Sequence, residues 1–209
     1  ITSSVSANNT YGFSIVSYTG TGSVKTVGHG LNSAPEFYIV KRRSNSEDWA
    51  VYSASLGANK YTKLSQSAAT YTNTTIWNNT SPTNSVFTVG NDVSVNGSGD
   101  TYIAYCWSEV AGFSKFGSYT GNGQSTNDGG KVIDVGFSPK LVMVKRTDNS
   151  GNWMIFDAPR NASQVGSNAG KTPYLRPNLA NGEDETGTQC TFSSTGFTLG
   201  SLNDVNASG

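Results

Sequence analysis

The sequence has little charge, one histidine and no long apolar run. Only 13% of its 209 residues are charged, and 14 basic side chains balance 14 acidic ones. There is no surplus of Lys and Arg to neutralise phosphates, so we expect no binding to nucleic acid. No apolar run approaches the roughly 18 residues that a membrane-spanning helix needs, so we expect no membrane insertion.

Side chains that commonly carry catalysis or bind metals are scarce. The single histidine, His29, lies in a turn between two glycines, where a loop role is commoner than a catalytic one. No Cys-x-x-Cys or His-x-x-x-His spacing occurs, which argues against zinc. Glu183, Asp184 and Glu185 are adjacent but lack the alternating spacing of an EF-hand calcium loop, so we interpret them as a solvated acidic loop. We therefore predict a protein that is not an enzyme and has no cofactor or metal.

Cysteine is limited to Cys106 and Cys190. The two thiols could form one disulfide, but each lies in only one half of the chain and has no counterpart in the other half. We expect two buried free thiols, because unpaired cysteine is among the most buried residue types.

Glycine, serine, threonine and asparagine are abundant in place of charged residues. A hydrophobic content of 35% would also suit a disordered chain, but disordered segments usually lack aromatic residues. Here aromatic residues make up 11% and recur at intervals. This composition favours a folded protein with many short strands joined by polar turns.

One motif is present twice in the chain. The stretch KRRSNSEDWAVYSA (Lys41–Ala54) aligns without a gap with KRTDNSGNWMIFDA (Lys145–Ala158). Further matched blocks pair Gly12–Ser14 with Gly112–Ser114, Tyr18–Gly20 with Tyr119–Gly121, Ala34–Arg43 with Ser138–Thr147, Phe87–Gly90 with Phe197–Gly200, and Val95–Gly99 with Val205–Gly209. Insertions fall between the blocks, where loops belong. We predict two tandem β repeats, residues 1–110 and 111–209.

Alternation of apolar and polar residues predicts the strands, and no segment has convincing helical periodicity. The predicted strands are Phe13–Tyr18, Val24–Val27, Glu36–Lys41, Trp49–Tyr52, Ser85–Val89 and Thr101–Trp107 in the first copy, and Lys115–Tyr119, Val132–Asp134, Lys140–Lys145, Trp153–Asp157, Gln189–Phe192 and Gly196–Leu199 in the second. Short strands at this spacing predict an all-β fold resembling a β-sandwich or a jelly roll.

The second copy lacks its closing strand. In the first copy Gly99 is followed by DTYIAYCWSEV, whereas the second copy stops at Gly209. The first ten residues, ITSSVSANNT, are too polar to replace that strand convincingly. We expect either that the native chain continues or that another subunit supplies the strand.

Aromatic residues in polar surroundings are the candidates for binding. Trp49 and Trp153 each follow a polar turn, and we interpret them as core anchors, with stacking on carbohydrate as the alternative. Trp77, Tyr71 and Tyr61 lie in the polar segment NKYTKLSQSAATYTNTTIWNN. We predict that these three contact a glycan or receptor, and packing beneath a long loop is the alternative.

The duplicated motif resembles a repeat domain of phage virion proteins, which is frequent in tail fibres and other structural proteins of marine phages. The resemblance covers residues 12–209 and rests on YTGTG and YTGNG, on the strand ends VKRR and VKRT, on the Trp after each polar turn, and on YIAYCWSE. It implies a module on the surface of the virion, in a fibre or spike that attaches to the host, and it supplies no catalytic residue.

The partners that this resemblance implies are other virion subunits, a homo-oligomer such as a trimer, and a host-surface glycan. Two alternatives stay open at this point. The chain could be a capsid decoration or head-fibre protein, or it could be a carbohydrate-binding module of a secreted protein.

Overall fold

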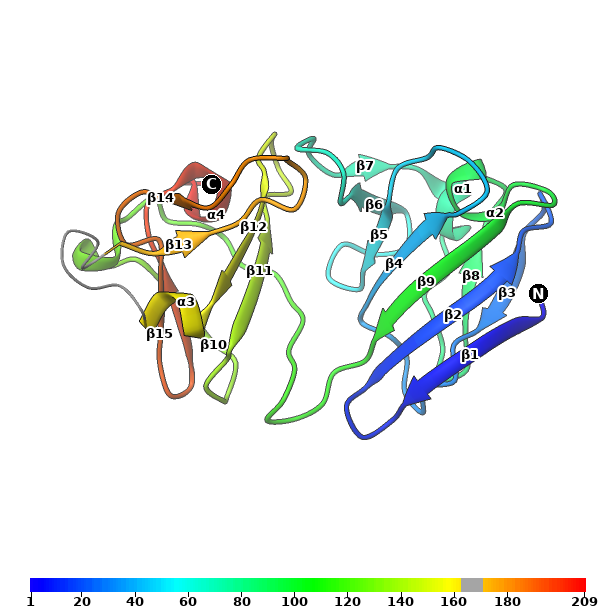
Figure 1. The fold of residues 1–209 in the computed structure, drawn as a ribbon, viewed down its shortest axis with the longest axis horizontal. Coiled ribbons are helices and arrows are strands. Elements are labelled where there is room, and N and C mark those ends of the chain that lie inside the picture. The colour runs from blue at the N-terminus through cyan, green and yellow to red at the C-terminus, as the bar shows by residue number, and fades with distance from the viewer. Residues whose placement is uncertain (163–170) are drawn as a thin grey trace. The chain divides into compact units, whose positions relative to one another are not determined.

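The computed structural model describes residues 1–162 and 171–209, and the chain divides into two compact units. Unit 1 consists of residues 1–64 and 70–117, and unit 2 consists of residues 65–69 and 118–209 (Figure 1). The sequence placed the division after residue 110. The short segment 65–69 lies within the first sequence repeat but belongs to the second compact unit.

Unit 1 is built on an antiparallel sheet in which the last strand of the unit lies near the centre. Figure 1 shows β9 between β2 and β4, and the strand order is β1-β2-β9-β4-β5-β6-β7. The strands are β1 (Ser3–Asn8), β2 (Phe13–Thr19), β4 (Phe37–Arg42), β5 (Ala50–Ser53), β6 (Lys60–Lys63), β7 (Tyr71–Thr72) and β9 (Thr101–Trp107).

A second layer covers one face of this sheet. It consists of the strand pair β3 (Lys25–Gly28) and β8 (Val86–Val89) with the short helices α1 (Thr74–Trp77) and α2 (Val93–Asn96). Side chains from both layers share one core, which includes Val27 and Phe87 from the second layer and Tyr38 and Tyr102 from the large sheet. Unit 1 is therefore a two-layer β-sandwich.

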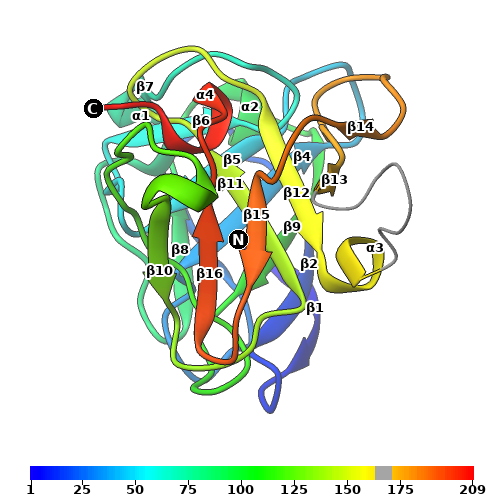
Figure 2. The ribbon, with the colours of Figure 1, turned by 90° about the vertical axis from the view of Figure 1, so that its left-hand side faces the viewer.

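Unit 2 contains smaller antiparallel sheets. Figure 2 shows β10, β16 and β15 side by side, and the other pairs are β11 with β12 and β13 with β14. The elements are η1 (Thr126–Asp128), β10 (Lys131–Asp134), β11 (Leu141–Lys145), β12 (Trp153–Asp157), α3 (Ala158–Ala162), β13 (Pro173–Tyr174), β14 (Asp184–Glu185), β15 (Cys190–Phe192), β16 (Gly196–Leu199) and α4 (Asn203–Asn206). Their buried core includes Val144, Met154, Phe156 and Leu199.

The predicted all-β class is confirmed, and so are most of the predicted strands. The prediction of a strand at residues 115–119 is wrong, because these residues form no strand. Their counterpart in unit 1, β2, is held between β1 and β9. The described residues of unit 2 contain no strands that pair with residues 115–119 in this way. Strand β1 was not predicted because its residues are almost all polar and exposed, as an edge strand allows.

The repeated Tyr-x-Gly-x-Gly motif serves the same turn in both units. A side chain at Gly20 would place its Cβ atom 2.3 Å from the carbonyl oxygen of Gly97, and one at Gly121 would lie 2.1 Å from that of Ala207. The second glycine of each motif, Gly22 or Gly123, has a positive φ of about 70°. The first glycine thus permits close backbone approach and the second permits a left-handed turn.

A buried asparagine closes each of these turns. The Asn96 side chain accepts a hydrogen bond from the Thr21 amide (2.8 Å) and donates to the carbonyl oxygens of Ser23 (2.7 Å) and Gly90 (2.6 Å). In unit 2, Asn206 accepts from the Asn122 amide at 2.8 Å and donates to its side-chain oxygen, also at 2.8 Å. Both asparagines are almost completely buried. The same residue type therefore joins the same two loops in each unit.

Candidate binding surface

The structure places Trp77 in the core of unit 1, so the prediction that it contacts a receptor is wrong. Its side chain has no exposed surface, and its ring packs edge-on against Tyr38 (4.9 Å between centroids) and Tyr52 (6.0 Å). Asn73 causes this placement, because its side chain caps α1 by accepting a hydrogen bond from the Thr75 amide at 2.8 Å. The capped turn directs Ile76 and Trp77 inward.

Tyr61 and Tyr71 form a stacked pair at the margin of the same core, with centroids 5.1 Å apart. Tyr61 is buried, whereas Tyr71 is half-buried and has the Lys63 ammonium 5.0 Å from its ring centroid. Lys63 also forms an ion pair with Asp48 at 2.8 Å. Of the three predicted contact residues, only Tyr71 presents part of its ring at the surface, and the three do not form one surface.

A different set of aromatic side chains gathers on the outer face of the large sheet of unit 1. We call this set the aromatic row, and its members, all half-buried, are Phe13, Phe37, Trp49, Tyr105, Trp107 and Phe116. Trp107 lies between Phe13 (5.0 Å) and Phe37 (5.7 Å), and Phe116 stacks on Phe37 at 5.9 Å. Trp49 and Tyr105 are nearly parallel at 6.5 Å.

Strand register brings the row together. Both Phe13 of β2 and Phe37 of β4 lie directly opposite Trp107 of β9. Along β9 the buried residues Tyr102, Ala104 and Cys106 alternate with half-buried ones, so the strand carries apolar side chains on both faces. The sequence TYIAYCW already contained this signal, since an apolar run without polar alternation indicates a strand with two covered faces.

The aromatic row combines flat ring faces with one nearby cation. The Lys41 ammonium lies 5.8 Å from the Trp49 ring centroid, and it also donates to the carbonyl oxygen of Glu47. Aromatic rings that are partly exposed offer large, rigid contact area at low entropic cost. The arrangement suits stacking against an apolar face of a ligand, with Lys41 near one end. The predicted core anchor Trp49 thus belongs to this face, whereas Trp153 is buried as predicted.

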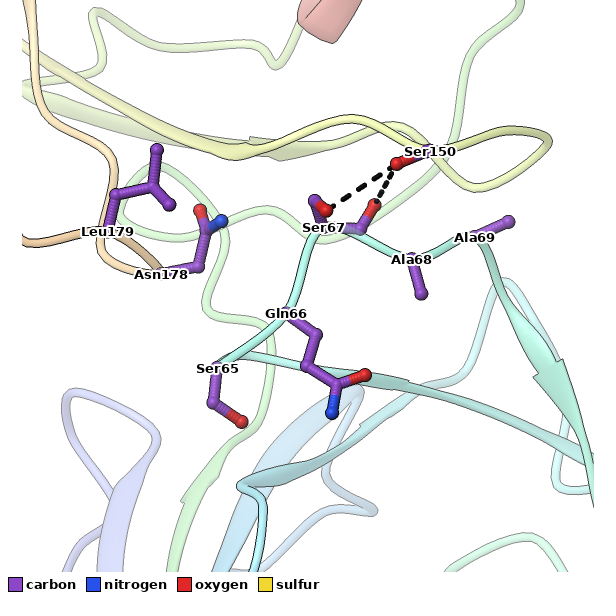
Figure 3. Close-up of a pocket in the computed structure, with 8 residues that line it drawn as sticks. All are labelled: Ser65, Gln66, Ser67, Ala68, Ala69, Ser150, Asn178 and Leu179. Atoms are coloured by element: carbon purple, nitrogen blue, oxygen red, sulfur yellow. Dashed lines mark hydrogen bonds between the residues drawn. The ribbon is translucent and has the colours of Figure 1, made fainter.

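Unit 2 has an open depression of about 680 Å³, shown in Figure 3 and lined by Ser65–Ala69, Ser150, Asn178 and Leu179. The carbonyl oxygen of Ser67 accepts hydrogen bonds from the Gly151 amide (2.8 Å), the Ser150 hydroxyl (3.3 Å) and the Lys145 ammonium (3.3 Å). These contacts tie segment 65–69 to the turn between β11 and β12. The polar groups of the depression therefore have a structural role.

His29 is a structural residue. It is completely buried, its Nδ1 atom accepts from the Leu31 amide at 3.1 Å, and its Nε2 atom therefore carries the proton donated to the Thr83 carbonyl oxygen at 3.1 Å. Burial lowers the pKa of His29 below its ordinary value, and the hydrogen bond to Thr83 opposes this only in part. The imidazole is held neutral and away from solvent.

Two carboxylates of the acidic loop form ion pairs with arginines. Glu183 forms an ion pair with Arg160 at 2.8 Å, and Asp184 forms one with Arg176 at 3.1 Å. Within the described ranges, no group of three His, Cys, Asp or Glu side chains is placed to hold a metal ion. These carboxylates thus fasten neighbouring segments of unit 2 together.

Both cysteines are free and buried, which confirms the expectation of unpaired thiols. Burial raises the pKa of the Cys106 thiol to about 12, and it has the same effect on Cys190. At neutral pH the folded protein therefore presents no reactive thiolate at either position.

The fold defines an all-β protein of two compact units. The chain belongs to the family described as a domain of unknown function (DUF7483), whose model matches residues 1–209. No curated protein and no solved structure matches the chain. In the parts of the chain that the structure describes, no helix has the length and apolar character needed to cross a bilayer.

Proposed function

We propose that this chain is a non-enzymatic structural module of a bacteriophage virion, and that it belongs to a tail fibre or spike and attaches the particle to a glycan on the host surface. The observation that carries the binding role is the aromatic row of unit 1. The duplicated sequence motif supports the virion role through its resemblance to repeats of phage structural proteins.

The chemistry of the row fits a sugar ligand. Pyranose rings present apolar C–H faces that stack on aromatic side chains, and Tyr105 and Trp49 lie nearly parallel on the outer face. Lys41 lies beside Trp49 and would favour an anionic sugar. In this proposal the polar residues of β1 and the surrounding loops form the rim, and the aromatic rings supply most of the binding energy.

Binding is tested with the full chain on an array of bacterial surface polysaccharides. We expect at least one glycan to bind, and Tyr105→Ala to weaken that binding about fivefold or more. Tyr11→Ala is the matched control, because Tyr11 is 53% exposed and lies outside the row. Circular dichroism establishes that both variants are folded. Failure of the wild-type chain to bind any glycan, or equal affinity of the Tyr105→Ala variant, would overturn the binding role.

The place on the virion needs a separate measurement. Gold-labelled antibodies against the chain, imaged on particles whose genome encodes it, should decorate the tail. Label on heads alone would replace the tail proposal with capsid decoration, and particles without label would refute the virion role. For the oligomer, light scattering of the purified chain should give the mass of a trimer, and a monomer at high concentration would contradict self-association.

A further inference from the structure

Strand β11 has one edge that no strand of the described residues pairs with. Its other edge pairs with β12, where Met143 lies opposite Ile155. The backbone groups of Ile155 do not bond to Met143. The Ile155 amide donates to the Leu175 carbonyl oxygen at 2.9 Å, and the Ile155 carbonyl oxygen accepts from the Leu175 amide at 3.1 Å. Hydrogen-bonded and non-hydrogen-bonded pairs alternate in an antiparallel ladder, so the backbone groups of Met143 point to the unpaired edge. Those of Lys145, two residues further, point the same way.

Unit 1 shows what occupies the corresponding edge. The shared motif aligns β11 with β4, so that Met143 corresponds to Ile39 and Lys145 to Lys41. In unit 1, Ile39 lies opposite Tyr105 of β9, and Lys41 lies opposite Ile103. The occupant of this edge in unit 1 is therefore an antiparallel strand that places Tyr102, Ala104 and Cys106 on its inner face.

The inner face of unit 2 has a tyrosine, Tyr119, in the position where unit 1 has the tyrosine that contacts β9. In unit 1, the Tyr102 ring of β9 stacks on Tyr18 at 5.2 Å with an angle of 15° between the rings. Tyr119 corresponds to Tyr18, and its hydroxyl donates to the carbonyl oxygen of Val205 as that of Tyr18 donates to Val95. No described aromatic ring stacks on Tyr119, which is half-buried.

The backbone also has the same conformation in both units at the residue that follows the last short helix. The residue after α2, Gly97, has φ −58° and ψ 140°, and the residue after α4, Ala207, has φ −57° and ψ 144°. In unit 1 the chain runs from Gly97 through Gly99 into β9. The backbone of unit 2 leaves α4 in the same conformation.

We propose that the unpaired edge of β11 is a strand-acceptor site, which binds an antiparallel strand of the β9 type. The strand pairs with the backbone of Met143 and Lys145 and stacks an aromatic ring on Tyr119. This inference does not rest on the proposed attachment function, because it concerns only the backbone edge of unit 2.

The direct test appends a second copy of residues 100–109 after Gly209 of the full chain. Amide hydrogen exchange, read by NMR, should slow about tenfold or more at Met143 and Lys145. The control carries proline at the appended positions copied from Ile103 and Tyr105, whose amides would donate to β11. Its exchange at Met143 and Lys145 should match that of the chain without an extension.

Two outcomes would overturn the proposal. One is unchanged exchange at both amides in the chain with the intact extension. The other is equal slowing by the proline-bearing extension, which would mean that the added residues cover the edge without pairing. A synthetic peptide of residues 100–109 added in trans keeps the test decisive if the extended chain does not fold. Slower exchange at Met143 and Lys145 on titration with this peptide would support the site, and unchanged exchange at saturating peptide would refute it.

Discussion

Replacing Asn96 with alanine tests the reasoning about the duplicated turn. The side chain has no exposed surface and makes three hydrogen bonds, to Thr21, Ser23 and Gly90. Each contributes about 1 kcal/mol net, and the groups that lose their partner stay buried, so Asn96→Ala should destabilise unit 1 by about 3 kcal/mol. A change of this size corresponds to roughly a 150-fold increase in the population of the open state.

The two buried thiols provide the assay, because each unit contains one. Cys106 reports on unit 1 and Cys190 on unit 2. Burial raises the pKa of each thiol to about 12, so an alkylating reagent at pH 8 modifies a cysteine only after its surroundings open. Mass spectrometry of each cysteine peptide then measures opening of each unit in one sample.

We expect Asn96→Ala to accelerate labelling of Cys106 by roughly two orders of magnitude and to leave Cys190 nearly unchanged. Asn206→Ala should have the converse effect. Asn91→Ala is the matched control, since Asn91 is exposed on the surface near the same turn. Acceleration of Cys106 by less than about fivefold, or equal acceleration of both cysteines by either variant, would refute the argument that each asparagine closes its own unit.

Three further predictions concern other buried or half-buried groups. Trp77→Ala should lower the free energy of unfolding by about 3–5 kcal/mol, measured by urea titration, because it removes the largest fully buried side chain of unit 1; a loss below about 1 kcal/mol would mean that the ring is not a core residue. For His29, burial lowers the folded-state pKa below the value near 6.5 of the unfolded chain, so its stabilising contribution is present above pH 6.5 and declines as the pH falls. The urea midpoint of the wild type should therefore fall more steeply between pH 7 and about 5 than that of His29→Phe, and parallel curves would contradict the neutral, buried imidazole. For Lys145, burial lowers the pKa to about 8. An NMR titration of its side-chain amine should therefore show a midpoint of about 8 in the folded protein and of about 10.5 in denaturant. A midpoint that does not change on unfolding would refute the lowered pKa of Lys145.

The parts of the fold that the sequence predicted are those with a strong local pattern. Strands such as Thr101–Trp107 and Trp153–Asp157 have the predicted bounds, because a run of apolar, β-prone residues is a local signal. Short or polar strands, such as β1 and β7, depend on a neighbour for their pairing and carry no such signal. Residues 115–119 have the sequence pattern of a strand, but the described residues of unit 2 contain no neighbouring strands that pair with them.

The candidate site was harder to predict, because it depends on register between distant segments. Phe13, Phe37 and Trp107 come from three strands far apart in the sequence and meet only when β9 lies between β2 and β4. Trp77 misled the sequence interpretation for the opposite reason. Its polar neighbours suggested a surface loop, but the cap at Asn73 turns the segment so that the one large apolar ring points inward.

The central position of β9 also determines when unit 1 can fold during synthesis. The ribosome synthesises Thr101 only after it has synthesised the strands of the β1–β2 and β4–β5 pairs. In the sheet, β9 is the strand that lies between these two pairs and joins them. Until then each half presents an open edge with apolar side chains, a state that is prone to pair with other chains. The long-range contacts of β9 with β2 and β4 therefore make closure of this sheet a late and cooperative step, and a ribosome that pauses before residue 101 would leave unit 1 as two unjoined halves.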